Sequence, residues 1–251
     1  MITVKTPDEL KIMAEGGAKL AVIRDDLAKM VAPNVTPFDI EKKAQELILE
    51  AGGKPSFQMV KNYHWATCIN INDGVVHGIP GNVPFKEGDL VSIDAGMYYK
   101  GFHTDTSVTL PAGQASMEVE NFLEAGRKAL KAAINKVRSG NRVSDISQSI
   151  QSIVEQYGYS PVRALTGHGI GKELHEEPQI PCFWEEDAGK GEILTEGTVL
   201  AIEVIYTMGE YDLVKDVDNW TIRTKDGRIA GLFEETVAVT RDGSLVLTAW
   251  V

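Results

Sequence analysis

The sequence predicts an α+β fold made of two similar halves. Four helix-start signals occur in two pairs, and each pair precedes short apolar runs that glycine and proline interrupt, as expected for strands. The second pair follows the first at a distance of 110 residues for one helix and 108 residues for the other. We therefore expect two pseudo-symmetric helix–helix–strand halves, residues 1–115 and 116–251, within a single domain spanning 1–251.

Each expected helix begins at a recognisable capping pattern. Thr6-Pro7-Asp8-Glu9 combines an N-cap threonine, a proline in the first turn and a capping-box glutamate. Thr36-Pro37-Phe38-Asp39 repeats that opening, and Ser116 and Ser144 offer N-cap hydroxyls for the second pair. The four helices are expected to cover residues 6–33, 36–53, 116–140 and 144–158.

A strand-like segment also recurs between the halves. Residues 87–94 (EGDLVSID) match residues 196–203 (EGTVLAIE) at an offset of 109, and both apolar runs end in a carboxylate, Asp94 and Glu203. Chance similarity between two Glu-Gly turns is the alternative. A repeated unit explains this match together with the helix spacing.

Composition excludes several protein classes. The apolar fraction of 43% and the charged fraction of 24% are those of a globular protein, which excludes a disordered, collagen-like or coiled-coil chain. The 251 residues allow one or two domains, and no polar linker separates the halves, so we expect one. The net charge of −11 disfavours a broad surface for DNA.

The cysteines and the apolar segments predict a cytoplasmic protein. Cys68 and Cys182 lie far apart and form no CxxC pair, which disfavours a disulfide framework and a thiolate zinc site. The N-terminus shows no basic-then-apolar signal pattern. The most apolar stretch, residues 198–208, is about half a membrane span and contains Glu203. We expect no membrane association.

Acidic side chains interrupt four apolar strands. Asp94, Asp105 and Glu203 lie inside such strands, as does the pair Glu234-Glu235. An ionised carboxylate in a strand interior costs several kcal/mol unless it is compensated. A single one is usually paired with arginine or faces solvent. Four at related positions are better explained by divalent cations, which oxygen donors bind well.

Five histidines accompany the carboxylates: His64, His77, His103, His168 and His175. Glycines surround His168 in Gly167-His168-Gly169-Ile170-Gly171 and permit a close backbone approach to a ligand. Each histidine taken alone is better explained as a packed residue or a turn residue than as a catalytic one. Together with the carboxylates they favour a dinuclear site with oxygen and nitrogen ligands.

Other catalytic and nucleotide-binding motifs are missing from the sequence. Gly167-x-Gly169-x-Gly171 is not GxGxxG, and neither a phosphate loop, HExxH nor GxSxG occurs. A basic stretch on the third helix is most simply a solvated face, with a ribosome- or RNA-facing patch as the alternative. That stretch consists of Arg127, Lys128, Lys131, Lys136, Arg138 and Arg142.

The chain resembles the type I methionine aminopeptidases over essentially its whole length. The resemblance is carried by the order and spacing of seven motifs: Val76-His77-Gly78-Ile79-Pro80, Ile93-Asp94, Gly101-Phe102-His103-Thr104-Asp105-Thr106-Ser107, Gly167-His168-Gly169-Ile170-Gly171, His175-Glu176-Glu177-Pro178, Ile202-Glu203 and Phe233-Glu234-x-Thr236. It implies the pita-bread fold, in which two similar α+β halves surround a dimetal site.

The resemblance also implies two divalent ions, of Co, Mn, Fe(II), Zn or Ni, held by five ligands. These are Asp94, Asp105, His168, Glu203 and Glu234. The internal repeat pairs Asp105-Thr106 with Glu235-Thr236 and so favours Glu235 as the last ligand. The family pattern favours Glu234, followed by a residue that is usually histidine, and we adopt it.

The implied activity is removal of the initiator methionine from nascent polypeptides through a metal-bridged hydroxide. In this scheme Glu203 carries the proton, His175 donates a hydrogen bond to the carbonyl or oxyanion, and His77 contacts the scissile amide nitrogen. The expected partners are the N-terminal methionine of nascent chains and, transiently, the ribosome. The chain is expected to be monomeric.

The resemblance places Tyr63, Cys68, Trp220 and Leu174 around the methionine side chain. Residues 57–62, Val204 and Leu174 depart from the family pattern, which affects the pocket more than the metal ligands. Two alternatives stay open. One is another aminopeptidase or an X-Pro dipeptidase of this fold, although those usually carry a further N-terminal domain. The other is a non-catalytic binding protein on the same scaffold.

Overall fold

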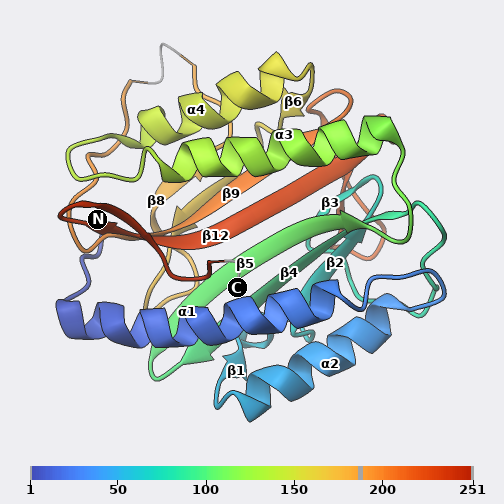
Figure 1. Ribbon diagram of the computed structural model, residues 1–251, viewed down its shortest axis with the longest axis horizontal. Coiled ribbons are helices and arrows are strands. Elements are labelled where there is room, and N and C mark those ends of the chain that lie inside the picture. The colour runs from blue at the N-terminus through green and yellow to red at the C-terminus, as the bar shows by residue number, and fades with distance from the viewer. Residues whose placement is uncertain (1, 186–188, 250–251) are drawn as a thin grey trace.

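A computed structural model describes residues 2–185 and 189–249 (Figure 1). Met1 and residues 250–251, the ends of the predicted domain, lie outside the described residues. Four long helices are present in the described ranges: α1 (Pro7–Ala28), α2 (Pro37–Glu50), α3 (Met117–Ile134) and α4 (Val143–Gln156). The first pair packs against strands of the N-terminal half and the second pair against strands of the C-terminal half.

Three of the four predicted helix starts are confirmed by their capping contacts. Thr6 Oγ1 accepts a hydrogen bond from Glu9 N at 3.3 Å, and Thr36 Oγ1 accepts one from Asp39 N at 3.1 Å. Ser116 Oγ accepts one from Val119 N at 3.2 Å. These contacts satisfy backbone donors that the first helical turn leaves unpaired.

The predicted start of the fourth helix is wrong. The helix begins at Val143, with Arg142 in the N-cap position, and Ser144 is already inside it and buried. The Asp145 carboxylate accepts a hydrogen bond from Arg142 N at 2.7 Å and so satisfies the backbone donor of the N-cap residue itself. An aspartate three residues after the cap is therefore the signal that the sequence interpretation missed.

The strands form one large and one small antiparallel sheet. In the N-terminal half they are β1 (Lys54–Pro55), β2 (Thr67–Ile71), β3 (Gly74–Val76), β4 (Leu90–Tyr99) and β5 (Phe102–Pro111), with a 3₁₀ turn at Phe57–Met59. In the C-terminal half they are β6 (Ser160–Pro161), β7 (Thr166–Gly169), β8 (Glu176–Pro181), β9 (Val199–Thr207), β10 (Leu213–Lys215), β11 (Ile222–Thr224), β12 (Ala230–Thr240) and β13 (Gly243–Val246).

The large sheet runs through both halves of the chain. Its strand order is β1-β4-β5-β12-β9-β7-β8, with β2 added to β4, β6 to β9 and β13 to β12, whereas β10, β11 and β3 form the small sheet. Strands β4 and β9 both continue beyond Asp94 and Glu203. Both carboxylates therefore lie in strand interiors, as expected for buried strand carboxylates, and they do not end their apolar runs as the repeated segment suggested.

Close helix–sheet packing holds each half together. A Cβ at Gly126 of α3 would lie 2.5 Å from the Phe233 ring, so only glycine allows this approach to β12. Phe122 of α3 stacks on Tyr206 of β9 with 4.2 Å between ring centroids. The Tyr206 hydroxyl also donates a hydrogen bond to Phe122 O at 2.6 Å. The buried stripe of α3 thereby positions the two strands that carry Glu203 and Glu234.

The basic stretch does not form one helical face. Arg127, Lys128 and Lys131 are exposed on α3, but Lys136 and Arg138 follow the end of that helix. Arg142, the last of the six, is the N-cap of α4. Among the described residues, no helix combines the length and the apolar character that a bilayer span requires.

Candidate metal centre and active site

One row of paired residues crosses the middle of the large sheet and carries three of the predicted ligands. Asp94 of β4 pairs with Ser107 of β5, Ser107 pairs with Glu234 of β12, and Glu234 pairs with Glu203 of β9. Directly opposite residues of antiparallel strands point to the same face. Asp105 lies two residues before Ser107 and shares that face. The register therefore collects four carboxylates from both halves.

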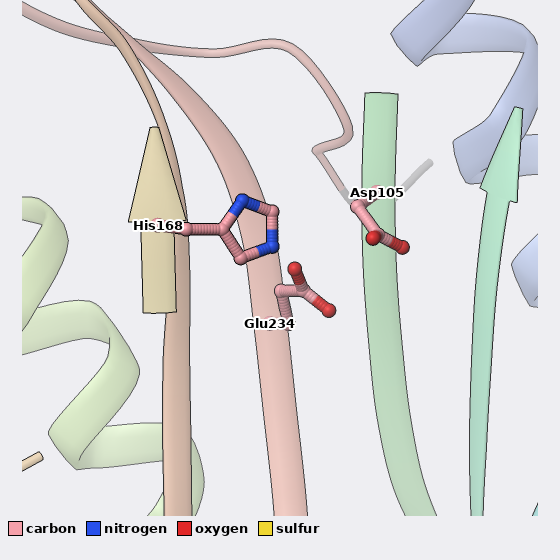
Figure 2. A group of neighbouring side chains, drawn as sticks. All are labelled: Asp105, His168 and Glu234. Carbon is pink, nitrogen blue, oxygen red and sulfur yellow. The ribbon is translucent and has the colours of Figure 1, made fainter. Parts of the chain in front are cut away.

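His168 of β7 completes this group from the neighbouring strand. It pairs with Ala201, two residues before Glu203, and its Nε2 lies 3.6 Å from Glu203 Oε1. Figure 2 shows His168, Asp105 and Glu234 converging from three strands, and ligand atoms of these residues lie within 4.8 Å of one another. This cluster could hold a divalent metal ion.

The protonation of His168 suits a metal ligand. Its Nδ1 lies 2.8 Å from the carbonyl oxygen of Gly169, which can only accept a hydrogen bond, so Nδ1 carries the proton. Burial lowers the pKa of His168 to about 4, which keeps the ring neutral at pH 7. The Nε2 lone pair is therefore available toward the carboxylates.

The two adjacent glutamates of β12 have separate environments. Glu234 faces the other carboxylates, whereas Glu235 faces the opposite side and accepts a hydrogen bond from Arg24 Nη1 at 3.0 Å. Adjacent strand residues point to opposite faces of the sheet, so only one of the two glutamates can belong to the cluster. The structure thus places Glu234, rather than the Glu235 favoured by the internal repeat, beside Asp105 and His168.

Burial and mutual repulsion make the carboxylate cluster costly without cations. Burial raises the pKa of Asp94 to about 7. Burial and the neighbouring carboxylates raise the pKa values of Asp105, Glu203 and Glu234 well above the ordinary range. Within the described chain, no hydrogen-bond partner reaches Asp94 Oδ1 or Glu234 Oε1. Unpartnered buried oxygens beside a neutral imidazole are a donor set that fits divalent metal ions.

The metal-free protein is expected to lose stability as the pH rises from 6.5 to 8.5. A carboxyl group whose pKa is higher in the folded than in the unfolded chain keeps a proton that unfolding releases, so its deprotonation favours unfolding. Raising the pKa of Asp94 to about 7 corresponds to roughly 4 kcal/mol once that group is ionised, and most of this loss falls below pH 6.5. The loss continues above pH 6.5 because the pKa values of Asp105, Glu203 and Glu234 are raised well above their ordinary range. The histidines whose pKa values are lowered have the opposite effect, since they add stability as the pH rises, but most of that gain lies below pH 6.5.

Thermal melts in a chelator at several pH values measure this effect. The melting temperature should fall between pH 6.5 and 8.5, and Asp94→Asn should make this fall smaller. Excess Mn²⁺ should restore the melting temperature at pH 8.5. A flat or rising profile in the parent chain would contradict the raised pKa values.

The carboxylates and His168 line one wall of a cavity of about 160 Å³. Its other walls are mainly apolar: Phe57, Val60, Tyr63, Cys68, Val76, Leu174 and Trp220. The rings of Tyr63 and Trp220 meet edge to face at 5.0 Å, and burial raises the pKa of the Cys68 thiol, so it stays uncharged. Aromatic rings and a neutral sulfur suit a thioether side chain.

His77 and His175 also line this cavity, and both are exposed to solvent. The His175 ring lies 4.5 Å from the His168 ring, between centroids, and the His77 ring lies 6.4 Å from the Trp220 ring. His77, directly after β3, has φ of 58°, which is uncommon outside glycine. All eleven predicted site residues, Leu174 included, therefore line one cavity.

Three buried charged residues that the sequence interpretation did not single out support this cavity. Glu41 accepts hydrogen bonds from Ala66 N at 2.7 Å and Thr67 N at 2.9 Å, at the start of the strand that carries Cys68. Lys5 Nζ lies 2.6 Å from the Glu176 carboxylate, next to His175. Arg24 lies behind Glu235. Their sequence neighbourhoods give no signal, because each partner is distant along the chain.

Three comparisons with known proteins agree with this geometry. The sequence model of "Metallopeptidase family M24" matches residues 11–241. "Methionine aminopeptidase 1" of Bacillus subtilis is 38% identical over 248 residues, which cover 99% of each chain. The crystal structure of methionine aminopeptidase from Thermotoga maritima is 37% identical, with a TM-score of 0.96 and 99% of each chain covered.

A prolidase shares the architecture at a greater distance. The structure of prolidase from Pyrococcus furiosus is 23% identical, with a TM-score of 0.79, and the match covers 98% of this chain and 65% of that one. At this identity the likeness shows a common fold alone.

Proposed function

Because the chain belongs to metallopeptidase family M24, we propose that it removes the N-terminal methionine from polypeptides by hydrolysing their first peptide bond. The chain is a hydrolase of the methionine aminopeptidase type, and peptides that begin with methionine are its substrates. The predicted family, the enzyme class and the α+β pita-bread fold are confirmed. The observation that carries the proposal is the convergence of buried carboxylates and a neutral histidine beside an apolar cavity.

The family uses divalent metal, and we propose that this chain holds two ions. Asp94, Asp105, Glu203 and Glu234 would hold them through carboxylate oxygens, and His168 through its Nε2 atom. The orphaned oxygens of Asp94 and Glu234 support this assignment. Oxygen and imidazole donors accept Mn, Co, Fe(II), Zn and Ni, so the ion used depends on its availability.

Bound divalent ions supply Lewis acidity, which polarises a peptide carbonyl and lowers the pKa of water. The protein residues would bind, orient and move protons. Glu203, with its strongly raised pKa, would accept a proton from water and pass it to the leaving amine. His175 would donate a hydrogen bond to the carbonyl oxygen, and His77 would contact the scissile nitrogen.

Substrate orientation would follow from the two ends of the cavity. Tyr63, Cys68 and Trp220 would pack against the methionine side chain. The free α-ammonium group of the substrate would lie near the carboxylates, which attract its positive charge. Only the N-terminus of a chain carries such a charge next to the first peptide bond. This arrangement accounts for cleavage restricted to the first peptide bond.

Metal-dependent release of methionine tests the proposal directly. We expect the folded protein to release methionine from Met-Ala and Met-Gly peptides, to lose this activity on chelation, and to recover it with Mn²⁺, Co²⁺ or Fe²⁺. Elemental analysis should find about two divalent ions per chain. X-Pro dipeptides serve as a control, since the prolidase likeness concerns the fold alone. No methionine release with any of these metals would refute the proposal, and no bound metal would favour a binding scaffold.

We also propose that residues 1–251 act as one monomeric catalytic domain on nascent chains in the cytoplasm, with transient ribosome contact. The continuous central sheet supports a single domain, because its site uses strands from both halves. The exposed Arg127 and Lys131 on α3 are candidates for the ribosome contact.

A further inference from the structure

Arg24 of α1 is fully buried, at 0% exposure, on the side of the sheet opposite the carboxylate cluster. Its Nη1 lies 2.9 Å from Thr106 Oγ1, 3.0 Å from Glu235 Oε1 and 2.9 Å from the carbonyl oxygen of Thr248. One guanidinium group therefore links a helix, the two central strands and the C-terminal segment.

The two strands that Arg24 links carry metal ligands from different halves of the chain. Thr106 follows Asp105 on β5, Glu235 follows Glu234 on β12, and Thr106 and Glu235 are a directly paired position of the sheet. Neighbouring strand residues point to opposite faces of the sheet. Arg24 therefore contacts these two strands on the face opposite to the one that carries Asp105 and Glu234.

Backbone pairing between these two strands is short. Over the described residues, β5 and β12 share two paired positions, whereas β4 and β5 share ten and β9 and β12 share nine. Side chains supply much of the remaining connection. The Thr106 hydroxyl donates to Glu234 O at 2.9 Å, and the Thr236 hydroxyl donates to Asp105 O at 2.7 Å. The spacing of the two halves at the site thus depends on a few side-chain contacts.

We propose that Arg24, through its contacts with Thr106 and Glu235, is a positioning residue that sets the separation of Asp105 and Glu234 for metal binding. This inference rests on the proposed function for its metal centre. The Arg24–Glu235 pair bridges the short ladder at the paired position next to both ligands. Outer residues of this kind orient metal ligands without touching the metal, and their loss typically lowers metal affinity 10–100-fold.

Removing Arg24 alone would leave the Glu235 carboxylate buried without its cation and could prevent folding. The informative variant therefore changes both partners, in the double substitution Arg24→Met and Glu235→Gln. This pair keeps similar volumes and removes both fully buried charges, but it loses the charged bridge between β5 and β12. Arg24 also contacts the Asp25 carboxylate at 2.9 Å, and that side chain is 16% exposed, so water can solvate it in the variant. Replacement of a buried ion pair by neutral groups is often tolerated for stability.

Three measurements on the full chain separate positioning from general destabilisation. Thermal melts in a chelator report the stability of the metal-free protein, calorimetric titration with Mn²⁺ reports affinity, and the visible spectrum of the Co²⁺ form reports ligand geometry. We expect the double variant to melt close to the parent in chelator. Its Mn²⁺ affinity should fall about 10–100-fold, and its Co²⁺ spectrum should change.

A second buried ion pair in the same chain provides a matched control. Lys5 and Glu176 form a bridge of 2.6 Å whose side chains are 4% and 9% exposed, away from the β5–β12 ladder. The double substitution Lys5→Met and Glu176→Gln should leave the Mn²⁺ affinity and the Co²⁺ spectrum unchanged. An equal loss of affinity in this control would show that any lost ion pair weakens metal binding, and would overturn the proposal.

A folded Arg24→Met, Glu235→Gln variant with parental affinity and spectrum would also overturn it. If that variant does not fold, Arg24→Lys decides the question, because lysine keeps the charge and loses the planar fork. Parental affinity in Arg24→Lys would then refute the positioning role. A parent that binds metal but releases no methionine would overturn only the proposed function, whereas a parent that binds no metal would overturn both.

Discussion

Replacing Asp105 with asparagine is expected to abolish methionine release and to remove most of the bound metal. The amide keeps the shape of the side chain but removes a negative charge from the centre of the cluster, where Asp105 is 4% exposed. A metal ion contributes several kcal/mol of charge stabilisation to such a reaction, and each 1.36 kcal/mol changes the rate tenfold. We therefore expect kcat/KM to fall by about 10³-fold or more, measured as methionine release alongside elemental analysis.

The same substitution should have the opposite effect on the stability of the metal-free protein. Burial and repulsion by Asp94 and Glu203 raise the pKa of Asp105, so its ionised form destabilises the fold when no cation is present. Asp105→Asn should therefore raise the melting temperature in chelator at pH 8. In the parent chain, added metal should provide a larger stabilisation than in the variant.

An exposed aspartate provides the control for this experiment. Asp8 pairs with Lys11 on the surface of α1, and its side chain is 90% exposed. Asp8→Asn makes the same chemical change and should leave metal content, activity and the effect of chelation on stability unchanged. Full metal content and a normal rate in Asp105→Asn would show that Asp105 is not a ligand.

Replacing His175 with alanine is expected to lower kcat by about 10²-fold or more while both metals stay bound. This is the scale expected when one hydrogen-bond donor to the developing oxyanion is lost. His175 lines the cavity beside His168 but belongs to the segment before β8, outside the row of carboxylates. Steady-state kinetics and elemental analysis of the same samples separate the catalytic effect from metal loss.

His64 serves as the matched histidine. It is exposed, and it is not among the residues that line the cavity. His64→Ala should therefore keep the parental kcat and KM. A parental kcat in His175→Ala would contradict the assigned hydrogen bond. Loss of metal from that variant would instead show that His175 helps to hold the metal centre.

The departures from the family pattern near the pocket now have positions in the fold. Phe57 and Val60 of the unusual 57–62 segment line the cavity, as does Leu174. Val204 pairs with Phe233 in the β9–β12 ladder, directly after Glu203. The first three therefore affect the shape of the cavity in which we propose that the methionine side chain binds. Val204 affects the strand that carries Glu203, a proposed ligand.

The sequence by itself determined the elements and the kind of chemistry. Helix caps at Thr6, Thr36 and Ser116 are local signals, since the contacting groups lie within one helical turn. Carboxylates in apolar strands likewise predict a cation-binding site. The free-energy cost of burying an ionised carboxylate arises from the apolar residues beside it in the sequence. The motif order then identified the family and predicted a set of five ligands.

Tertiary structure alone decided which faces and partners these residues have. The internal repeat favoured Glu235, but strand pairing turns Glu234 toward Asp105 and Glu235 toward Arg24, because a shift of one residue reverses the face. The partners of Arg24 lie up to 224 positions away along the chain. Contacts of this separation depend on how strands from the two halves pair, which no local pattern of residues encodes.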